Sequence, residues 1–152
     1  MKCLVTGGAG FIGSNLVDRL VKLGYQVIVL DNLSTGRLSN LLQVKNKIEF
    51  VNVDVANSEN SIGQYFNDVD WVFHLAGLAD IVPSIKNPYN YFQTNVKGTL
   101  NILEASKKIK IKKLIYSASA SCYGIPEKYP TDEKSKIDLQ YPYALTKFLG
   151  EQ

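Results

Sequence analysis

The sequence has few of the residues that build metal sites and disulfide frameworks. Among 152 residues there are two cysteines, Cys3 and Cys122, and one histidine, His74. Two cysteines do not make a disulfide framework, and neither has the spacing of metal ligands. An excess of one charge is also lacking, because 17 basic and 14 acidic residues leave a formal charge of +3. We therefore expect no metal site and no nucleic-acid partner.

Long apolar segments are also lacking. No apolar run approaches the roughly 20 residues that a membrane span needs. Glycines at 7, 8 and 10 interrupt the first apolar run too early for a signal peptide. The densest basic stretch, Ser106–Leu114, is expected to be a solvated helix end whose lysines complement the helix dipole. These absences predict a cytoplasmic protein without a membrane partner.

Short apolar runs alternate with longer amphipathic stretches. The apolar runs predict buried strands at Lys2–Thr6, Gln26–Leu30, Lys47–Val53, Asp70–Leu75 and Lys113–Ser117. The amphipathic stretches predict helices at Phe11–Leu23, with Ile12, Leu16, Leu20 and Leu23 on one apolar face, at Tyr89–Lys107, and from Pro142. Continuous apolar strands separated by helices indicate an α/β fold with a Rossmann-like, doubly wound parallel sheet.

A glycine-rich turn joins the first strand to the first helix. Gly8, Gly10 and Gly13 have the spacing G-x-G-x-x-G of a dinucleotide-binding turn, and Gly7 precedes them. One glycine permits the tight turn, one lets the backbone approach a pyrophosphate, and one lets helix and strand pack closely. The free N–H groups at the helix start would then hold the phosphates.

An acidic residue ends the second predicted strand. Asp31 lies 18 residues after Gly13, close to the ~20 expected for the residue that binds the adenosine ribose. Its carboxylate would repel the extra phosphate of NADP, so NAD is favoured, although Arg37 keeps NADP open. The alternative interpretation of Asp31 is a turn-forming residue.

Two stretches carry side chains suited to proton transfer. Tyr143 and Lys147 lie one turn apart on one face of the last predicted helix. A free tyrosine titrates near pH ~10, but a neighbouring ammonium stabilises the phenolate that acts as a base. Ser119 leaves the fifth strand and could share a proton with Tyr143, with Ser121 as the alternative hydroxyl. Both pairs also have structural interpretations, as a surface helix and as a serine-rich loop capping backbone groups.

Taken together, these motifs resemble the extended short-chain dehydrogenase/reductase family, and within it the NAD-dependent epimerases and dehydratases. The resemblance covers Lys2–Gln152 and is greatest toward UDP-glucose 4-epimerases and UDP-N-acetylhexosamine epimerases. It rests on the segments Thr6–Ser14, Asp31–Gly36, Asp54–Val55, His74–Gly77, Asn95–Thr99, Ser119–Gly124 and Tyr143–Lys147.

The resemblance implies roles for the matching residues. Tyr143 would be the catalytic base, Lys147 would bind the nicotinamide ribose and tune Tyr143, and Ser119 would be the supporting hydroxyl. The sugar would meet Ser84, Ser119, Ser121 and Tyr143. NAD would be bound by Gly7, Gly10, Phe11, Ile12, Gly13, Asp31, Asn32, Ser34, Thr35, Gly36, Asp54, Val55, Leu75, Ala76, Gly77, Asn95, Tyr143 and Lys147.

Some of these residues have simpler interpretations. Asp54 could terminate a strand, Asn95 could be a polar helix residue, and His74 at a strand end is expected to be structural. The aromatic residues Tyr89, Tyr91 and Phe92 are expected to serve packing.

Two departures from the family pattern refine the predicted function. Ser119–Ser121 holds no carboxylate where the dehydratases of this family have one, which argues against dehydration and decarboxylation. Ala79 stands where a frequent family pattern has lysine. We predict an NAD-dependent 4-epimerase acting on a UDP-hexose or UDP-N-acetylhexosamine. The alternatives are an NAD(P)-dependent nucleotide-sugar reductase or dehydratase and a non-catalytic NAD-binding module.

The domain organisation follows from the same resemblance. Residues 1–152 are expected to be the NAD-binding Rossmann domain of a longer epimerase whose C-terminal substrate domain is missing from this chain. Family members usually dimerise through the helices that correspond to Tyr89–Lys107 and to the one that opens at Pro142, so a homodimer is expected.

Overall fold

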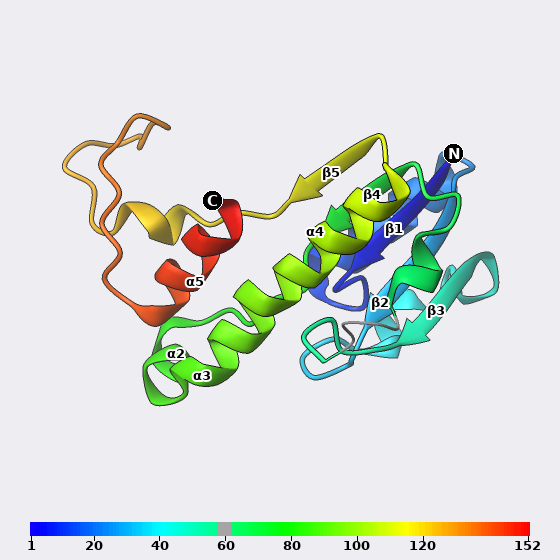
Figure 1. Cartoon of the computed structure of the whole chain (residues 1–152), viewed down its shortest axis with the longest axis horizontal. Helices are drawn as coiled ribbons and strands as arrows, with labels where there is room; N and C mark the ends of the chain where they lie inside the picture. Colours follow the sequence, from blue (N-terminus) through cyan, green and yellow to red (C-terminus); the bar gives the residue numbers. More distant parts are fainter. Residues whose placement is uncertain (58–61) are drawn as a thin grey trace.

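The computed structural model describes residues 1–57 and 62–152 and contains one parallel sheet (Figure 1). The strands run in the order β3-β2-β1-β4-β5. Their bounds are β1 (Lys2–Thr6), β2 (Gln26–Asp31), β3 (Ile48–Asn52), β4 (Trp71–His74) and β5 (Lys113–Tyr116). Each predicted strand is confirmed to within one residue at either end. The chain reverses its direction of winding between β1 and β4, and in open α/β sheets ligands bind beside such a point.

Both faces of the sheet are covered by packed side chains. Successive side chains of a strand point to opposite faces, so each strand contributes to both layers. On one face, Leu4, Ile28 and Val72 pack with Ile102 of helix α4 (Gly98–Ile109). On the other face, Val5 and Val29 pack with residues of helix α1 (Phe11–Lys22). The predicted doubly wound α/β architecture is therefore confirmed.

Helix α1 begins at Phe11 as predicted and ends at Lys22, one residue before the predicted end, but the predicted apolar face is not the buried one at two positions. Ile12 is 63% and Leu23 is 49% exposed, whereas Val17 and Leu20 are buried. Gly13 lies against the backbone of Gly7 and Gly8, and the face of the helix that continues from it, with Val17 and Leu20, is the buried one. Gly24 ends the helix with a φ of +80°, in the left-handed conformation that favours glycine at this place.

The helix predicted at Tyr89–Lys107 is divided into three parts. Helix α3 (Pro88–Tyr91) leads into a π-helical segment, η4 (Phe92–Lys97), and then into α4. The packing expected of the three aromatic residues holds for Tyr91, which is 4% exposed, but not for Tyr89 or Phe92, which are exposed. The π-helical segment changes which side chains face the sheet, and a periodicity of 3.6 does not predict this change.

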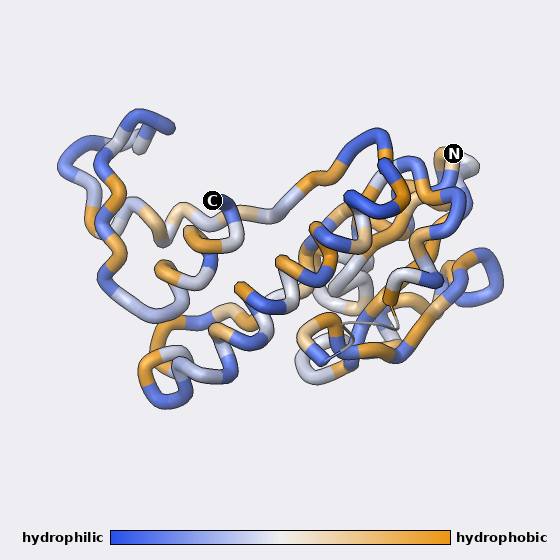
Figure 2. Tube along the Cα trace, viewed as in Figure 1, coloured by the Kyte–Doolittle hydropathy of each residue, from blue (hydrophilic) through white to orange (hydrophobic). Residues whose placement is uncertain are grey.

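Short elements complete the fold around these layers. The 3₁₀ turns are η1 (Leu38–Leu41), η2 (Lys45–Lys47), η3 (Ile62–Phe66) and η5 (Ala120–Tyr123). The remaining helices are α2 (Ile81–Lys86), which the sequence did not predict, and α5 (Pro142–Glu151). Helices α2, α3 and α5 lie together beyond the end of the sheet (Figure 1). Figure 2 shows the lysine-rich turn between α4 and β5 as a hydrophilic segment. None of the helices described is long and apolar enough to cross a membrane.

Candidate cofactor and catalytic site

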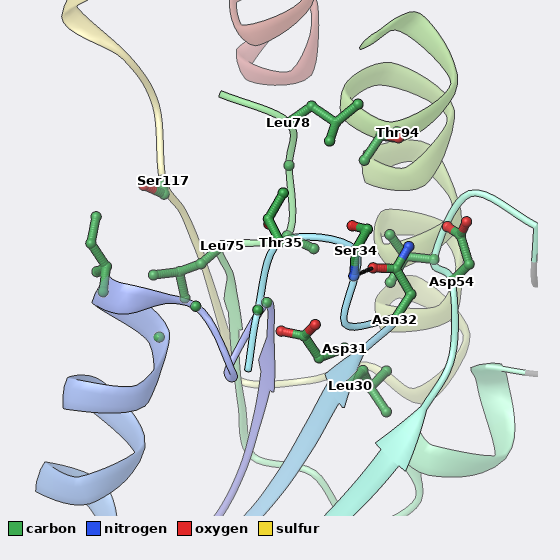
Figure 3. A pocket seen from close by; sticks show the side chains of 18 of the residues that line it. Leu30, Asp31, Asn32, Ser34, Thr35, Asp54, Leu75, Leu78, Thr94 and Ser117 are labelled. Carbon is green, nitrogen blue, oxygen red and sulfur yellow. Dashed lines mark hydrogen bonds between the residues drawn. The ribbon is translucent and has the colours of Figure 1, made fainter. Parts of the chain in front are cut away.

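A cavity of about 290 Å³ lies at the carboxyl ends of the strands. In Figure 3 its side chains follow β2, β3, β4 and β5 in turn, at Asp31, Asp54, Leu75 and Ser117. The cavity is lined by Gly7, Gly10, Phe11, Ile12, Gly13, Leu30, Asp31, Asn32, Ser34, Thr35, Gly36, Val53, Asp54, Val55, Leu75, Ala76, Gly77, Leu78, Thr94 and Ser117. Of the predicted cofactor residues, all except Asn95, Tyr143 and Lys147 line it.

The glycine turn forms one wall of the cavity, with no room for side chains at two positions. Gly7 has a φ of +68°, and a Cβ there would lie 2.7 Å from the backbone N of Ala76. A Cβ on Gly13 would lie 2.2 Å from the carbonyl oxygen of Gly7. Helix α1 has Gly10 as its N-cap residue, and Gly10 offers no side-chain cap. Its first N–H groups and the positive end of its dipole therefore face the cavity without a side-chain acceptor at the cap, as an anion-binding helix start requires.

Asp31 is held rigidly at the end of β2. Its Oδ2 accepts a hydrogen bond from the backbone N of Ala9 at 2.9 Å, and its Oδ1 accepts one from the N of Leu33 at 2.8 Å. The bond to Leu33 is the turn contact of the alternative interpretation, so the turn role is present in the structure. Each carboxylate oxygen keeps a further lone pair, and the residue lines the cavity. A turn role and a ribose-binding role are therefore compatible.

Asp54 follows β3 and stabilises the turn after that strand. Its Oδ1 accepts a hydrogen bond from the N of Ala56 at 2.8 Å, and its Oδ2 accepts one from the side chain of Asn57 at 3.2 Å. The carbonyl of Val55 accepts a bond from Asn101 of α4 at 2.8 Å. These bonds fix the wall of the cavity opposite the glycine turn, where the resemblance places the adenine.

Asn95 holds the loop after β4. Its Oδ1 accepts the backbone N–H of Leu78 at 2.8 Å, and its Nδ2 donates to the carbonyl of the same residue at 3.0 Å. The Nδ2 also donates to the hydroxyl of Thr146 in α5 at 3.1 Å. Asn95 is 1% exposed, so its side chain acts as a buried brace between the cavity loop and the helix that carries Tyr143 and Lys147.

His74 lies in a buried chain of hydrogen bonds, as the structural interpretation expected. The backbone N of Ala76 donates to the Thr6 hydroxyl, which therefore has its own proton available for His74 Nδ1 at 2.6 Å. His74 Nε2 then donates to the hydroxyl of Thr99 at 3.0 Å, and that hydroxyl donates to the carbonyl of Asn95 at 2.6 Å. Burial lowers the pKa of His74 to about 3, so the ring is neutral and has one donor and one acceptor.

Helix α5 brings Tyr143 and Lys147 to the side of the cavity where α2 and α3 pack. The hydroxyl of Ser84, which is fully buried, accepts the backbone N–H of Tyr143 at 3.1 Å and so caps the first turn of α5. The Tyr143 ring meets that of Tyr91 edge-on, with centroids 6.3 Å apart. A sugar contact for Ser84 stays a prediction.

Lys147 is buried, and its Nζ lies 4.2 Å from the centroid of the Tyr116 ring. Burial lowers the pKa of Lys147 to about 8. A pKa near 8 lies close to neutral pH, and such a pKa suits a group near a proton-transfer site.

Ser119 and Ser121 lie at the start of η5. The Ser119 hydroxyl accepts the backbone N–H of Ser121 at 3.3 Å, which is the capping role of the alternative interpretation. Within the described residues, neither hydroxyl is hydrogen-bonded to Tyr143, so their catalytic and sugar-binding roles stay predictions.

Among residues 1–57 and 62–152, no group of three His, Cys, Asp or Glu side chains is arranged to hold a metal ion.

Several cavity residues were not predicted from the sequence. They are Leu30, Val53, Leu78, Thr94 and Ser117. Four of them directly precede or follow a predicted site residue, and Ser117 follows the fifth strand. The carboxyl ends of parallel strands meet at one edge, so the strand ends are a signal that could have found Leu30, Val53 and Ser117.

A model of the NAD-dependent epimerase/dehydratase family matches residues 3–152. The chain belongs to this family. The predicted family is confirmed, and NAD is the cofactor in the description of that family.

The relatives and solved structures are consistent with this assignment. The chain is 37% identical to the UDP-glucose 4-epimerase of Bacillus subtilis over 158 residues, covering 100% of this chain and 46% of that protein. The structure of the Thermotoga maritima UDP-glucose 4-epimerase with UDP-glucose has a TM-score of 0.93 and 38% identity, covering 99% and 49%. The UDP-N-acetylglucosamine 4-epimerase of Methanobrevibacter ruminantium with UDP-N-acetylmuramic acid has a TM-score of 0.92 and 35% identity, covering 99% and 48%. The chain spans about half the length of the relatives it matches.

Proposed function

We propose that this chain is the NAD-binding part of a nucleotide-sugar 4-epimerase that acts on a UDP-hexose or UDP-N-acetylhexosamine. The observation that carries the proposal is one cavity that combines the glycine turn, the uncapped start of α1 and the Asp31 carboxylate. Helix α5, with Tyr143 and Lys147, lies on the side of this cavity where Asn95 joins it to the loop after β4. The epimerase names of the relatives support the reaction class.

The residues present fit an NAD molecule. The missing Cβ atoms at Gly7 and Gly13 let the glycine turn pack closely against the loop after β4 and against the start of α1. The first N–H groups of α1 would hold the charge of a pyrophosphate. Asp31 would accept hydrogen bonds from the adenosine ribose through its remaining lone pairs. The exposed side chains of Phe11 and Ile12, which line the cavity, would cover the diphosphate.

The chemistry then divides between the cofactor and the chain. When bound, NAD would supply a reversible hydride acceptor for C-4 of the sugar. The phenolate of Tyr143 would take the proton of the 4-hydroxyl and give it back at the end of the cycle. Lys147 would bind the nicotinamide ribose and hold positive charge near the phenolate, and Ser119 would donate a hydrogen bond to the sugar oxygen. The whole cycle would involve no net oxidation of the sugar.

The residues beside Ser119 favour epimerisation over dehydration. Loss of water from a sugar needs an acid that protonates the departing hydroxyl. Ser119, Ala120 and Ser121 offer no carboxylate, and the nearby Cys122 thiol is buried with its pKa raised by that burial. The segment therefore supplies hydroxyl donors for a ketone or alkoxide but no strong general acid.

The proposal is tested on the longest native reading frame that contains this chain. A panel of UDP-hexoses, UDP-N-acetylhexosamines and UDP-hexuronates is followed by proton NMR while absorbance at 340 nm reports NADH. The expected result is a C-4 epimer without net NADH, and loss of turnover in Tyr143→Phe. A dehydrated keto product, stoichiometric NADH or full turnover by Tyr143→Phe would refute it, and binding of NAD without turnover of any sugar would favour a non-catalytic module.

We also propose a homodimer, which the exposed apolar side chains of two adjacent helices support. Leu100 and Leu103 of α4 are 56% and 42% exposed, and Leu145 and Leu149 of α5 are 44% and 41% exposed. Sedimentation equilibrium should give twice the mass of the chain, and Leu103→Glu should give the single mass. A cytoplasmic location stays a prediction.

A further inference from the structure

Lys147 is an amine that the fold buries without an acidic partner. Its side chain is 7% exposed, and within residues 1–57 and 62–152 no carboxylate lies within salt-bridge distance of its Nζ. A buried charge without a partner is costly, so another group must stabilise the ammonium. The face of the Tyr116 ring, with its centroid 4.2 Å from Nζ, is in the right place to do so.

Tyr116 is itself fixed under helix α5 at its hydroxyl end. Its hydroxyl donates a hydrogen bond to the backbone carbonyl of Lys147 at 3.1 Å. Gly150 packs so closely on the phenol that a Cβ there would lie 2.4 Å from the hydroxyl oxygen and 2.9 Å from Cζ. On its other side the ring faces His74, with centroids 5.7 Å apart. The ring therefore has one orientation available to it.

We propose that Tyr116 is a positioning residue for Lys147. The ring face binds the ammonium, and the hydroxyl fixes the turn of α5 from which the lysine extends. The inference rests on the proposed function, because there Lys147 binds the nicotinamide ribose and acts on Tyr143. A lysine has four carbons of flexible stem, and an ammonium held on a ring loses most of that freedom.

The neighbouring ionisable groups do not provide a substitute for the ring. Cys122 of η5 and His74 of β4 interact with Lys147 electrostatically. Burial raises the pKa of the Cys122 thiol and lowers the pKa of His74 to about 3, so both are uncharged near neutral pH. On α5 itself, Tyr143 and Glu151 act on the Tyr116 ring. The ring face is thus the electron-rich surface that meets the ammonium.

The test separates the charge of the ring face from its size. Tyr116 is replaced by phenylalanine and then by phenylalanines with one, two and three fluorine atoms, which withdraw charge from the ring face with little change of shape. The chain is labelled with ¹³C at the lysine Cε, Lys147→Arg assigns the signal, and the pH titration is recorded without cofactor. We expect the Lys147 midpoint to fall stepwise, by about one pH unit over the series, the size of a desolvated cation–π interaction.

A matched control places the same fluorinated residues at Phe50. That residue is on β3, at the edge of the sheet opposite β5, so its substitution should leave the Lys147 midpoint unchanged. A midpoint that stays constant across the series at position 116 would overturn the inference. Because the titration needs neither NAD nor a sugar, its failure is distinct from a failure of the proposed function.

Discussion

The glycine turn makes the most specific prediction, because one added methyl group should damage both stability and cofactor binding. In Gly13→Ala the new Cβ would lie 2.2 Å from the carbonyl oxygen of Gly7, 2.7 Å from the Cα of Gly8 and 2.9 Å from the carbonyl carbon of Gly7. All three atoms belong to the backbone, so no side chain can rotate away. Helix α1 must move away from the turn by roughly 1 Å to reach an ordinary contact distance.

The expected cost follows from the geometry. Overpacking of this kind typically costs about 1–3 kcal/mol, and contact with backbone alone places this substitution in the upper half of that range. For a domain of this size, about 2 kcal/mol corresponds to a fall in Tm of roughly 6 °C. The displaced N–H groups should also weaken NAD binding by about tenfold or more.

Gly63→Ala is the matched control. A Cβ on Gly63 meets nothing within 4 Å, and its backbone is not left-handed. Thermal unfolding is followed by circular dichroism, and NAD binding is followed by quenching of protein fluorescence. The control should keep the parent Tm and affinity. A Gly13→Ala protein that matched the control in both measurements would show that the turn is not packed as described.

Three further predictions concern buried polar groups. Asp31→Asn should weaken NAD binding by about tenfold and reduce discrimination against NADP, because the charge that repels the 2′-phosphate is removed; unchanged affinities for both nucleotides would contradict this. Burial lowers the pKa of His74 in the folded chain to about 3, whereas its ordinary pKa is 6.5. Between these two pH values the unfolded chain binds a proton that the folded chain does not bind. The free energy of unfolding should therefore fall as the pH drops through that window, with a slope of up to ~1.4 kcal/mol per pH unit. Denaturant titrations at several pH values should show this slope in the parent and lose it in His74→Gln. Lys147→Met should abolish turnover but raise the free energy of unfolding at pH 7 by about 2 kcal/mol, because burial disfavours the ammonium and lowers its pKa to about 8. A less stable variant would contradict this account of the buried charge.

The sheet and the glycine turn were predictable from the sequence because both depend on local patterns. Buried parallel strands appear as short apolar runs, and each of the five strands has one. The turn depends on four glycines within seven residues, and the structure uses Gly7 and Gly13 where a side chain would collide with backbone. Because these patterns involve neighbouring residues only, the sequence alone is sufficient to predict the strands and the turn.

The π-helical segment was not predictable from periodicity, and its buried residue Asn95 has partners far away in the chain. The side chain of Asn95 is hydrogen-bonded to Leu78 and Thr146, while its carbonyl accepts the hydroxyl proton of the nearby Thr99. Such side-chain bonds compete with the regular helix ladder. A helical pattern in the sequence cannot encode contacts whose partners lie in another loop and another helix.

The candidate site was predicted in part for similar reasons. Asp31 followed from its distance to the glycine turn, and the structure gives it a turn contact as well. The role of Tyr116 did not follow, because an aromatic residue at a strand end usually serves packing, and the contact with Lys147 exists only once α5 packs on β5. The caps made by Ser84 and Ser119 also depend on tertiary packing or local geometry rather than on motif spacing.

The most direct test of the central claim is the fate of the hydrogen on C-4. The nucleotide sugar that the NMR panel identifies as substrate is prepared with deuterium at C-4 and incubated with the longest native reading frame that contains this chain, and the product is analysed by NMR and mass spectrometry. The account predicts the C-4 epimer with the deuterium retained at C-4 and with no net NADH, because the hydride leaves and returns within one site. Loss of the deuterium to solvent, or its accumulation in NADH, would contradict the account.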